Sequence, residues 1–289
     1  MSANIYQIVT DRICEQLNKG IIPWNRPWTG VADGAISYTT RKPYSLLNQM
    51  LLGEDGEYIT FNEVAKLGGK VKKGAKSQMV VFFKKYVKEE TGINPDTGEE
   101  ENKEKISFAL RYYNVFNVKD CEGIPAKMRD EKRLFTEDKT GEEVISEYIN
   151  REASNGFKFE NIKGNRAYYS PSLDKVVLPL KEQFKKEGEY YSTAFHEIAH
   201  STLKECRCNR KQKEIVHFGD EDYSKEELVA EITSANICSV TGIETASTFQ
   251  NSVAYIQSWL RALQNDTKMI VFASSHAEKA TRYILGITE

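Results

Sequence analysis

Two of the four histidines of the chain, His196 and His200, stand four residues apart around Glu197 in the string His-Glu-Ile-Ala-His. Residues i and i+4 lie on one face of a helix, so both imidazoles can reach a single metal ion. Glu197 lies about 100° further around the helix, where it can take a proton from a metal-bound water. The spacing therefore predicts a metal site that activates water.

A catalytic zinc site normally has three protein ligands and one water, so a third ligand has to come from another segment. Glu227 and Glu231 are four residues apart and share a helix face, whereas Glu226 points elsewhere on that helix. One glutamate of the pair can bind the metal while the other hydrogen-bonds a ligand histidine from behind. For Glu231, a solvated helix charge is the competing interpretation. Zinc is the expected ion, although these ligand types also accept manganese, cobalt or nickel.

Two further polar residues, His217 and Tyr223, precede the glutamate segment and could stabilise an oxyanion. Ordinary solvated loop side chains are the favoured interpretation for both of them. The pair Cys206 and Cys208 is spaced too closely for a zinc motif, and no second pair complements it.

The composition is that of a globular protein, with 289 residues, 40% apolar, 28% charged and a net charge of −2. The sequence contains no run of 18 apolar residues, and its first residues have no apolar signal-peptide core. The odd number of scattered cysteines, five in all, suits reduced thiols. We therefore expect a cytoplasmic protein that does not enter a membrane.

A local basic segment is hidden within this neutral total. Residues 66–88 contain eight lysines and no acid, and residues 89–104 that follow are acidic and rich in turn formers. A solvated lysine face and a buried strand are the competing interpretations of this segment. If it binds nucleic acid, lysines would contact phosphates and nearby aromatic rings would stack on bases. The candidates are Lys70, Lys72, Lys73 and Lys76 for phosphate, and Trp24, Trp28, Phe82, Phe83 and Tyr86 for stacking.

The elements that position these residues can be read from periodicity and capping signals. The sequence predicts an α+β fold with an N-terminal domain at 1–125 and a mainly helical C-terminal domain at 126–289 that includes a short β-sheet. In the N-terminal domain we expect helices over 4–19 and 44–52, a helix that begins at Thr60, and strands over 79–87 and 105–119 with an exposed loop at 89–104. In the C-terminal domain we expect helices over 141–153, 188–205, 224–241, 249–264 and 267–285, and two short strands within 166–179.

Several segments together resemble ArdC-type antirestriction proteins of plasmids and conjugative elements. The N-terminal half carries "TDRICEQLNKGIIPWNRPW", "KPYSLLNQMLL" and "YITFNEVAKLGGKVKKGAKS", and the C-terminal half carries "AYYSPSLDKVVLP", "YYSTAFHEIAHST" and "YSKEELVAEI". The resemblance implies a domain that binds single-stranded DNA, followed by a zincin-like metallopeptidase domain. It also implies His196, His200 and Glu227 as the zinc ligands, Glu197 as the catalytic base and Glu231 as the carboxylate behind the ligands. The "HST" after the second histidine departs from the larger aromatic residue expected there, which concerns packing and not ligation.

Two functions follow as hypotheses. The first is an antirestriction protein of a mobile element that guards single-stranded DNA during conjugation. Its zinc domain would either cleave a protein, such as a host restriction component, or serve as a non-hydrolytic structural or recruiting module. The alternative is an intracellular zinc endopeptidase whose basic domain selects protein substrates. Where the zinc domain hydrolyses a peptide bond, Glu197 would deprotonate the water for attack on the peptide carbonyl, with Tyr223 as an auxiliary group.

Overall fold

The computed structural model describes residues 4–25, 34–93, 100–127, 139–210, 221–244 and 253–287. In three stretches, 89–93, 100–106 and 221–223, it describes the backbone alone. The fold is α+β, as the sequence predicts. No helix within these ranges combines the length and the apolar character that crossing a membrane demands.

The N-terminal part is built on a four-stranded mixed sheet with the order β1-β2-β5-β4. Strands β1 and β2 are parallel, and the other two pairs are antiparallel. A small two-stranded sheet pairs β3 with β6. The strand bounds are β1 Ala35–Ser37, β2 Gly56–Thr60, β3 Lys70–Val71, β4 Gln78–Ile93, β5 Glu100–Asn117 and β6 Cys121–Glu122.

Three helices accompany this sheet: α1 (Ile5–Asn18), α2 (Leu46–Leu52) and α3 (Phe61–Lys66). Asn4 caps α1 by accepting a hydrogen bond from the Tyr6 backbone N–H at 3.2 Å. Helix α3 begins with the capping box that the sequence predicts, in which Thr60 and Glu63 each satisfy a backbone donor of the other.

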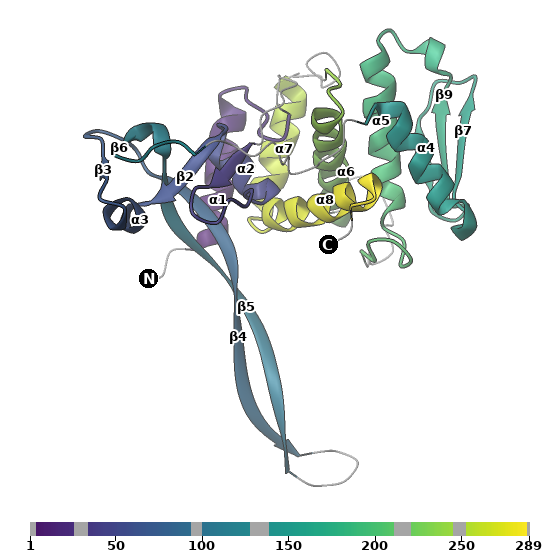
Figure 1. The fold of residues 1–289 in the computed structure, drawn as a ribbon. Helices are drawn as coiled ribbons and strands as arrows, with labels where there is room; N and C mark the ends of the chain where they lie inside the picture. The colour runs from purple at the N-terminus through teal and green to yellow at the C-terminus, as the bar shows by residue number, and fades with distance from the viewer. Residues whose placement is uncertain are drawn as a thin grey trace.

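Strands β4 and β5 form one long hairpin that projects away from the rest of the molecule (Figure 1). Their register runs from Gln78 opposite Val115 to Ile93 opposite Glu100. The prediction of a loop over 89–104 is therefore wrong, because most of that segment is strand. Backbone hydrogen bonds across a ladder do not require apolar side chains, so a charged sequence can extend a hairpin into solvent.

The C-terminal part places helices beside a three-stranded sheet of order β7-β9-β8. Strand β9 pairs in parallel with β7 and antiparallel with β8. The helices are α4 Gly141–Glu152, α5 Glu187–Ser201, α6 Glu221–Val240, α7 Val253–Asn265 and α8 Met269–Leu285, and the strands are β7 Lys158–Ile162, β8 Tyr168–Ser170 and β9 Lys175–Pro179. All five predicted helices and both predicted strands are confirmed, and β7 is an addition.

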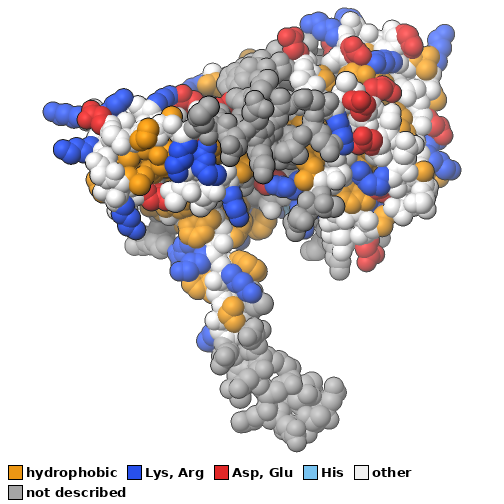
Figure 2. Space-filling model, viewed as in Figure 1, with side chains coloured by type: hydrophobic (Ala, Val, Ile, Leu, Met, Phe, Trp, Pro, Cys, Tyr) orange, Lys and Arg blue, Asp and Glu red, His pale blue; other side chains and the backbone are white. Residues whose placement is uncertain are grey.

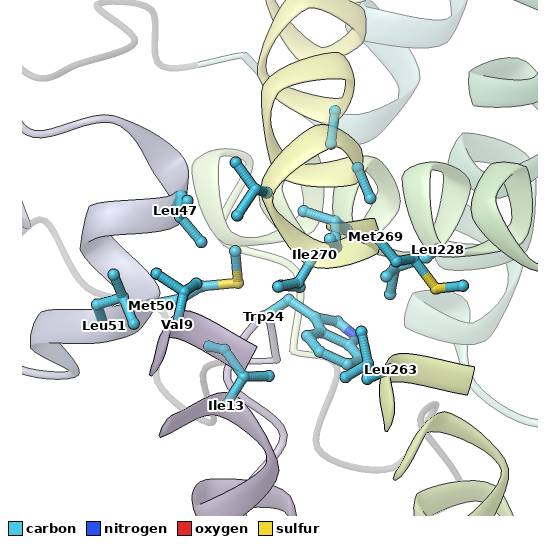
Figure 3. Close-up of a cluster of buried hydrophobic side chains, with 14 of the residues drawn as sticks. Val9, Ile13, Trp24, Leu47, Met50, Leu51, Leu228, Leu263, Met269 and Ile270 are labelled. Carbon is cyan, nitrogen blue, oxygen red and sulfur yellow. The ribbon is translucent and has the colours of Figure 1, made fainter. Parts of the chain in front are cut away.

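One hydrophobic core is shared by the two parts (Figure 3). Helix α1 contributes Val9 and Ile13, and helices α6, α7 and α8 contribute Leu228, Leu263 and Ile270. Further members come from α2 and from the base of the hairpin, namely Leu47, Met50, Leu51, Met79, Val81 and Leu110. Apolar burial is thus continuous across the expected domain boundary.

Candidate metal centre

Helix α5 carries the His-Glu-Ile-Ala-His string and is fixed by the face that it buries. Ala194, Phe195 and Ile198 are fully buried in the second hydrophobic core, together with residues of α4, α6, β9 and α8. The two histidines are on a less buried side, with 22% of the His196 side chain and 14% of the His200 side chain exposed. Packing of the apolar face therefore turns both imidazoles toward α6.

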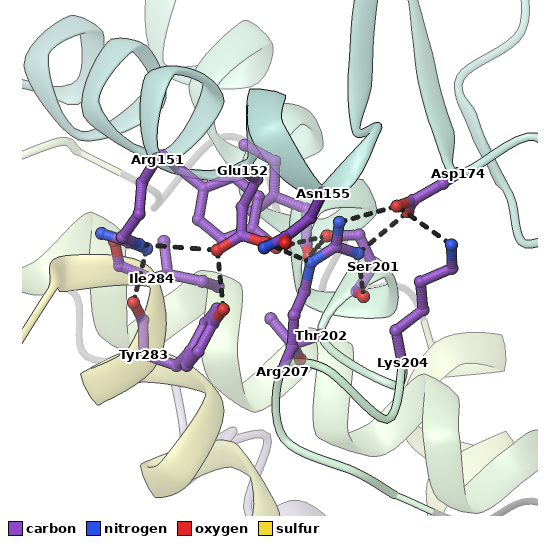
Figure 4. A network of polar contacts seen from close by, with 12 residues as sticks. Arg151, Glu152, Asn155, Asp174, Ser201, Thr202, Lys204, Arg207, Tyr283 and Ile284 are labelled. Carbon is purple, nitrogen blue, oxygen red and sulfur yellow. Dashed lines mark hydrogen bonds and ion pairs between the residues drawn. The ribbon is translucent and has the colours of Figure 1, made fainter.

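The end of α5 is held by a buried arginine, Arg207 (Figure 4). Its guanidinium donates to the Ser201 carbonyl at 2.7 Å, to Glu152 Oε2 at 2.8 Å and to both carboxylate oxygens of Asp174. Glu152 in turn accepts a hydrogen bond from Tyr283 of α8 at 2.6 Å. This network joins α4, α5, α8 and the β8–β9 turn next to the histidine pair.

The sequence-predicted ligands converge. Nε2 of His196 and Nε2 of His200 are 3.1 Å apart, and the Glu227 oxygens lie 3.5 and 3.4 Å from them. One atom from each of these residues falls within 4.8 Å of the others. Two nitrogens bound 2.0–2.1 Å from a tetrahedral zinc ion would be about 3.3 Å apart, so the donor set fits such an ion.

The electrostatics of the cluster also favour a cation. Burial by itself lowers the pKa of His196, but a hydrogen bond with Glu227 and the charges of Glu231 and Glu197 raise it to about 9. Burial raises the pKa of Glu197 and of Glu231, against the influence of the histidines. The carboxylates therefore stabilise positive charge at this position, which a divalent ion provides as a proton does.

A residue that the sequence reasoning set aside, Glu226, lies directly behind His200. Its Oε1 is 3.5 Å from Nδ1 of His200, the ring nitrogen that faces away from His196 and Glu227. Arg210 donates hydrogen bonds to both oxygens of the same carboxylate, from Nε to Oε2 at 3.2 Å and from Nη2 to Oε1 at 2.6 Å. The expectation that Glu226 points elsewhere is wrong, because a helix position 100° from Glu227 still faces the far edge of an imidazole on the neighbouring helix.

Glu226 is expected to orient His200, so a Glu226→Gln substitution should weaken divalent metal binding about 10- to 100-fold. The measurement is competition between the protein and a coloured chelator for Zn²⁺ and for Mn²⁺. Glu205→Gln, which changes an exposed glutamate in the turn after α5, is the matched control. Equal metal affinity in the two variants would show that Glu226 serves packing alone.

Glu231 lies close enough to His196 to raise the pKa of that imidazole. Burial raises the pKa of the Glu231 carboxyl, and the nearby Tyr255 of α7 acts in the opposite direction and lowers it. The structure thus brings Glu231 to the cluster and couples it to a tyrosine that the sequence reasoning did not consider. No pattern in the sequence relates Tyr255 to Glu231, because the two residues belong to different helices, α7 and α6.

Of the tryptophans predicted to stack on bases and the residues predicted to assist at the metal site, one tryptophan is buried and the other side chains lie outside the described part of the structure. Trp24 is only 5% exposed and packs edge-on against Trp259, with ring centroids 6.1 Å apart, so it is not available to stack on a base. The structural reason is that Trp24 joins the shared core. Trp28 and His217 lie outside the described residues, and the side chain of Tyr223 is likewise not described.

The four lysines expected to contact phosphate are all exposed. They lie in and after β3, between α3 and the hairpin, and Lys72 donates to the Lys119 carbonyl at 2.7 Å. Phe82 and Phe83 are also exposed, at 42% and 45%, on the hairpin. Figure 2 shows basic and hydrophobic side chains side by side on the stem of that hairpin.

Comparison with known families divides the chain into two matching parts. Residues 3–116 match the model of the N-terminal domain of anti-restriction factor ArdC. Residues 151–276 match the model of a zincin-like metallopeptidase. The histidine pair and Glu227 fall within the second match.

Among curated sequences, the chain is similar to a DNA primase TraC of Escherichia coli, with 30% identity over 98% of this chain. The match spans only 27% of the length of that primase. An uncharacterized protein, y4eC of Sinorhizobium fredii, is 28% identical over 96% of this chain and 90% of its own length.

Solved structures give the fullest agreement. The metal-free crystal structure of the antirestriction protein ArdC from plasmid R388 aligns with a TM-score of 0.68 and 30% identity, covering 98% of this chain and 97% of that one. The Mn(II)-bound structure of the R388 protein aligns with a TM-score of 0.70 and 28% identity, covering 99% and 98% of the two chains. Fold, sequence identity and mutual coverage lead to one conclusion: the chain belongs to the family of ArdC antirestriction proteins.

Proposed function

We propose that this protein binds single-stranded DNA through its N-terminal part and holds a catalytic divalent metal ion in its C-terminal part, as an antirestriction protein of a mobile genetic element. The observation that carries the metal half is the convergence of His196, His200 and Glu227 from α5 and α6. The DNA half is supported by the family of residues 3–116 and by the exposed lysines. Functionally we place the division at 1–125 and 126–289.

The metal is proposed to be Zn²⁺, with Mn²⁺ as an ion that the same ligands accept. A zincin-like family model matches this region, and the related R388 protein has a Mn(II)-bound structure. When bound, the ion would supply a polarising charge and a water of lowered pKa. Glu226 and Glu231 would orient and electrostatically support the ligand imidazoles.

Glu197 is the proposed general base. It is 9% exposed, adjacent in sequence to His196, and burial raises the pKa of its carboxyl. A carboxylate whose pKa approaches the working pH is better suited to accept and return a proton. Tyr223 is retained as a proposed auxiliary group that stabilises developing negative charge on a substrate carbonyl.

The proposed cellular role is to guard incoming single strands in the cytoplasm of the recipient during conjugation, with a protein substrate or a host restriction component as the target of the metal site. A plain endopeptidase is less favoured, since the N-terminal match is to an antirestriction factor. The two functions separate experimentally, because DNA protection by a Glu197→Gln variant in cells would show that antirestriction does not need hydrolysis.

Removing the exposed lysines is expected to weaken DNA binding in a salt-dependent manner. Each lysine–phosphate pair with a single strand contributes about 0.7 to the slope of log K against log salt, so Lys70, Lys72, Lys73 and Lys76 together contribute up to about 3. Fluorescence anisotropy of a labelled oligothymidylate at several salt concentrations measures this slope for the quadruple alanine variant.

The matched control changes four exposed lysines of the C-terminal part to alanine, namely Lys158, Lys163, Lys185 and Lys186. Both variants alter the net charge equally, so a slope change in the first alone locates the phosphate-binding lysines. An unchanged slope in the first variant, or an equal change in both, would remove these lysines from the DNA interface.

A further inference from the structure

The stem of the hairpin has two chemically different faces. Residues that lie opposite each other in an antiparallel pair share a face, and side chains alternate between faces along each strand. The pairs Phe82–Arg111, Lys84–Ala109 and Tyr86–Ser107 are therefore on one face, and Phe83–Leu110 and Lys85–Phe108 are on the other.

The first face alternates aromatic and basic side chains. We call it the aromatic–basic face, and its members are Phe82, Lys84, Tyr86, Lys88, Arg111 and Tyr113. The opposite face has mainly apolar members in the described stem, namely Phe83, Lys85, Val87, Phe108 and Tyr112. The stem as a whole, residues 78–88 and 107–117, contains three lysines, one arginine and no acid.

Side chains on the aromatic–basic face are arranged against one another. The rings of Phe82 and Tyr113 lie with centroids 5.7 Å apart. Arg111 donates to the Tyr86 hydroxyl at 3.1 and 2.9 Å, and the Lys84 ammonium lies 5.4 Å from the centroid of the Tyr86 ring. Tyr86 thus has two cations beside it, since the Arg111 guanidinium also lies 5.8 Å from its ring centroid, and Phe82 has a second ring beside it.

We propose that the aromatic–basic face is the surface on which single-stranded DNA lies, with bases stacked on Phe82 and Tyr86 and phosphates paired with Lys84, Lys88 and Arg111. This inference rests on the proposed DNA-binding function and assigns it to particular residues. Phe82 and Tyr86 are four residues apart on one strand, a separation of about 14 Å, so each ring receives its own base. Phe82 is exposed and Tyr86 is half-buried, and accessible rings interleaved with cations are the chemistry of sequence-tolerant single-strand binding.

Duplex DNA fits this face less well. A two-stranded ribbon can enter a major groove, but there it reads base edges through polar side chains, and the stacked bases leave no ring face open to Phe82 or Tyr86. The face is thus expected to prefer a single strand to a duplex of equal length.

The test uses the full chain and a labelled oligothymidylate, with a duplex of equal length as the competitor. A Phe82→Ala/Tyr86→Ala variant should lose affinity about 5- to 150-fold for each ring, and so at least about 25-fold if the two bases stack independently. Its salt slope should stay unchanged, because no phosphate-binding side chain is removed. The matched control, Phe83→Ala/Phe108→Ala, removes two exposed rings from the opposite face and should bind as the unaltered chain does.

A second variant separates charge from stacking. Changing Lys84, Lys88 and Arg111 to glutamine should lower the salt slope by about 2, since each phosphate contact with a single strand contributes about 0.7. Thermal unfolding of every variant verifies that the hairpin change leaves the body folded.

The outcomes distinguish this inference from the proposed function. If the unaltered chain fails to bind single strands, the proposed function itself fails. If the unaltered chain binds and the Phe82→Ala/Tyr86→Ala variant binds equally well, the face assignment is overturned and the function stands. Equal losses of affinity from both ring pairs would also overturn the assignment to one face.

Discussion

A His196→Ala variant is expected to lose stoichiometric divalent metal, with a fall in affinity of more than about 100-fold. We expect a loss of more than about 100-fold, because removing only a hydrogen-bond partner of a ligand histidine already lowers metal affinity about 10- to 100-fold. His196 contributes one of the three donor atoms that the structure brings within 4.8 Å of one another. Metal analysis of the purified protein and chelator competition with Zn²⁺ and Mn²⁺ measure the loss.

The control for this variant is Glu197→Gln, which alters the proposed base and leaves the three donor residues in place. It should keep metal stoichiometry and lose about 10²- to 10⁴-fold in any metal-dependent hydrolysis. Full metal occupancy in His196→Ala would refute the ligand assignment. Loss of metal in both variants would mean that Glu197 supports the ligands and is not simply a base.

The second large effect is on folding. Replacing Arg207 by methionine is expected to lower the free energy of unfolding by about 3–5 kcal/mol, because it removes the buried cation between Glu152 and Asp174 and leaves these buried carboxylates with the partly exposed cations of Arg151 and Lys204. Arg207 has a fully buried side chain, and the two carboxylates are 1% and 6% exposed. Urea unfolding at neutral pH measures the difference.

Lys204→Met provides the matched control, because Lys204 pairs with the same Asp174 at 3.1 Å but is 36% exposed. Loss of such a partly exposed pair is expected to cost less than about 1 kcal/mol. Equal destabilisation by the two substitutions would show that burial of the guanidinium does not determine its contribution.

Acid should reduce the advantage that Arg207 confers. Burial raises the pKa of Asp174 and of Glu152, but hydrogen bonds from Arg207 and from neighbouring hydroxyl groups lower both pKa values below the usual range. Carboxyl groups with lowered pKa contribute stability above their unfolded pKa of about 4, and this stability is lost as the pH falls through the lowered values. The difference between the wild-type protein and Arg207→Met should therefore be largest near neutral pH and shrink on acidification.

The local elements were accessible from the sequence because their causes are local. Apolar periodicity placed the helices, and the Thr60–Glu63 capping box marked the start of α3 as the sequence suggested. Apolar periodicity did not predict the strands in the acidic segment at 89–104. The charged side chains there do not alternate with apolar ones, and the strand pairing depends on backbone hydrogen bonds.

The positions of side chains that meet across the fold were less accessible. Burial of Trp24 depends on Trp259, which follows 235 residues later in the sequence, and no local pattern relates the two. The contact between Glu226 and His200 depends on how α5 and α6 lie against each other, which helix spacing alone does not determine. Spacing within one helix, by contrast, was sufficient to pair His196 with His200.

The core that runs from α1 through the hairpin base to α7 and α8 makes each part depend on the other for burial of its apolar side chains. A fragment that contains only one part would expose a large apolar surface with nothing to cover it, so we expect neither part to be stable by itself. The two TraC primases are consistent with this, since each matches 98% of the present chain within 27% and 20% of its own length. In those primases the matching stretch thus contains the N-terminal and C-terminal parts together.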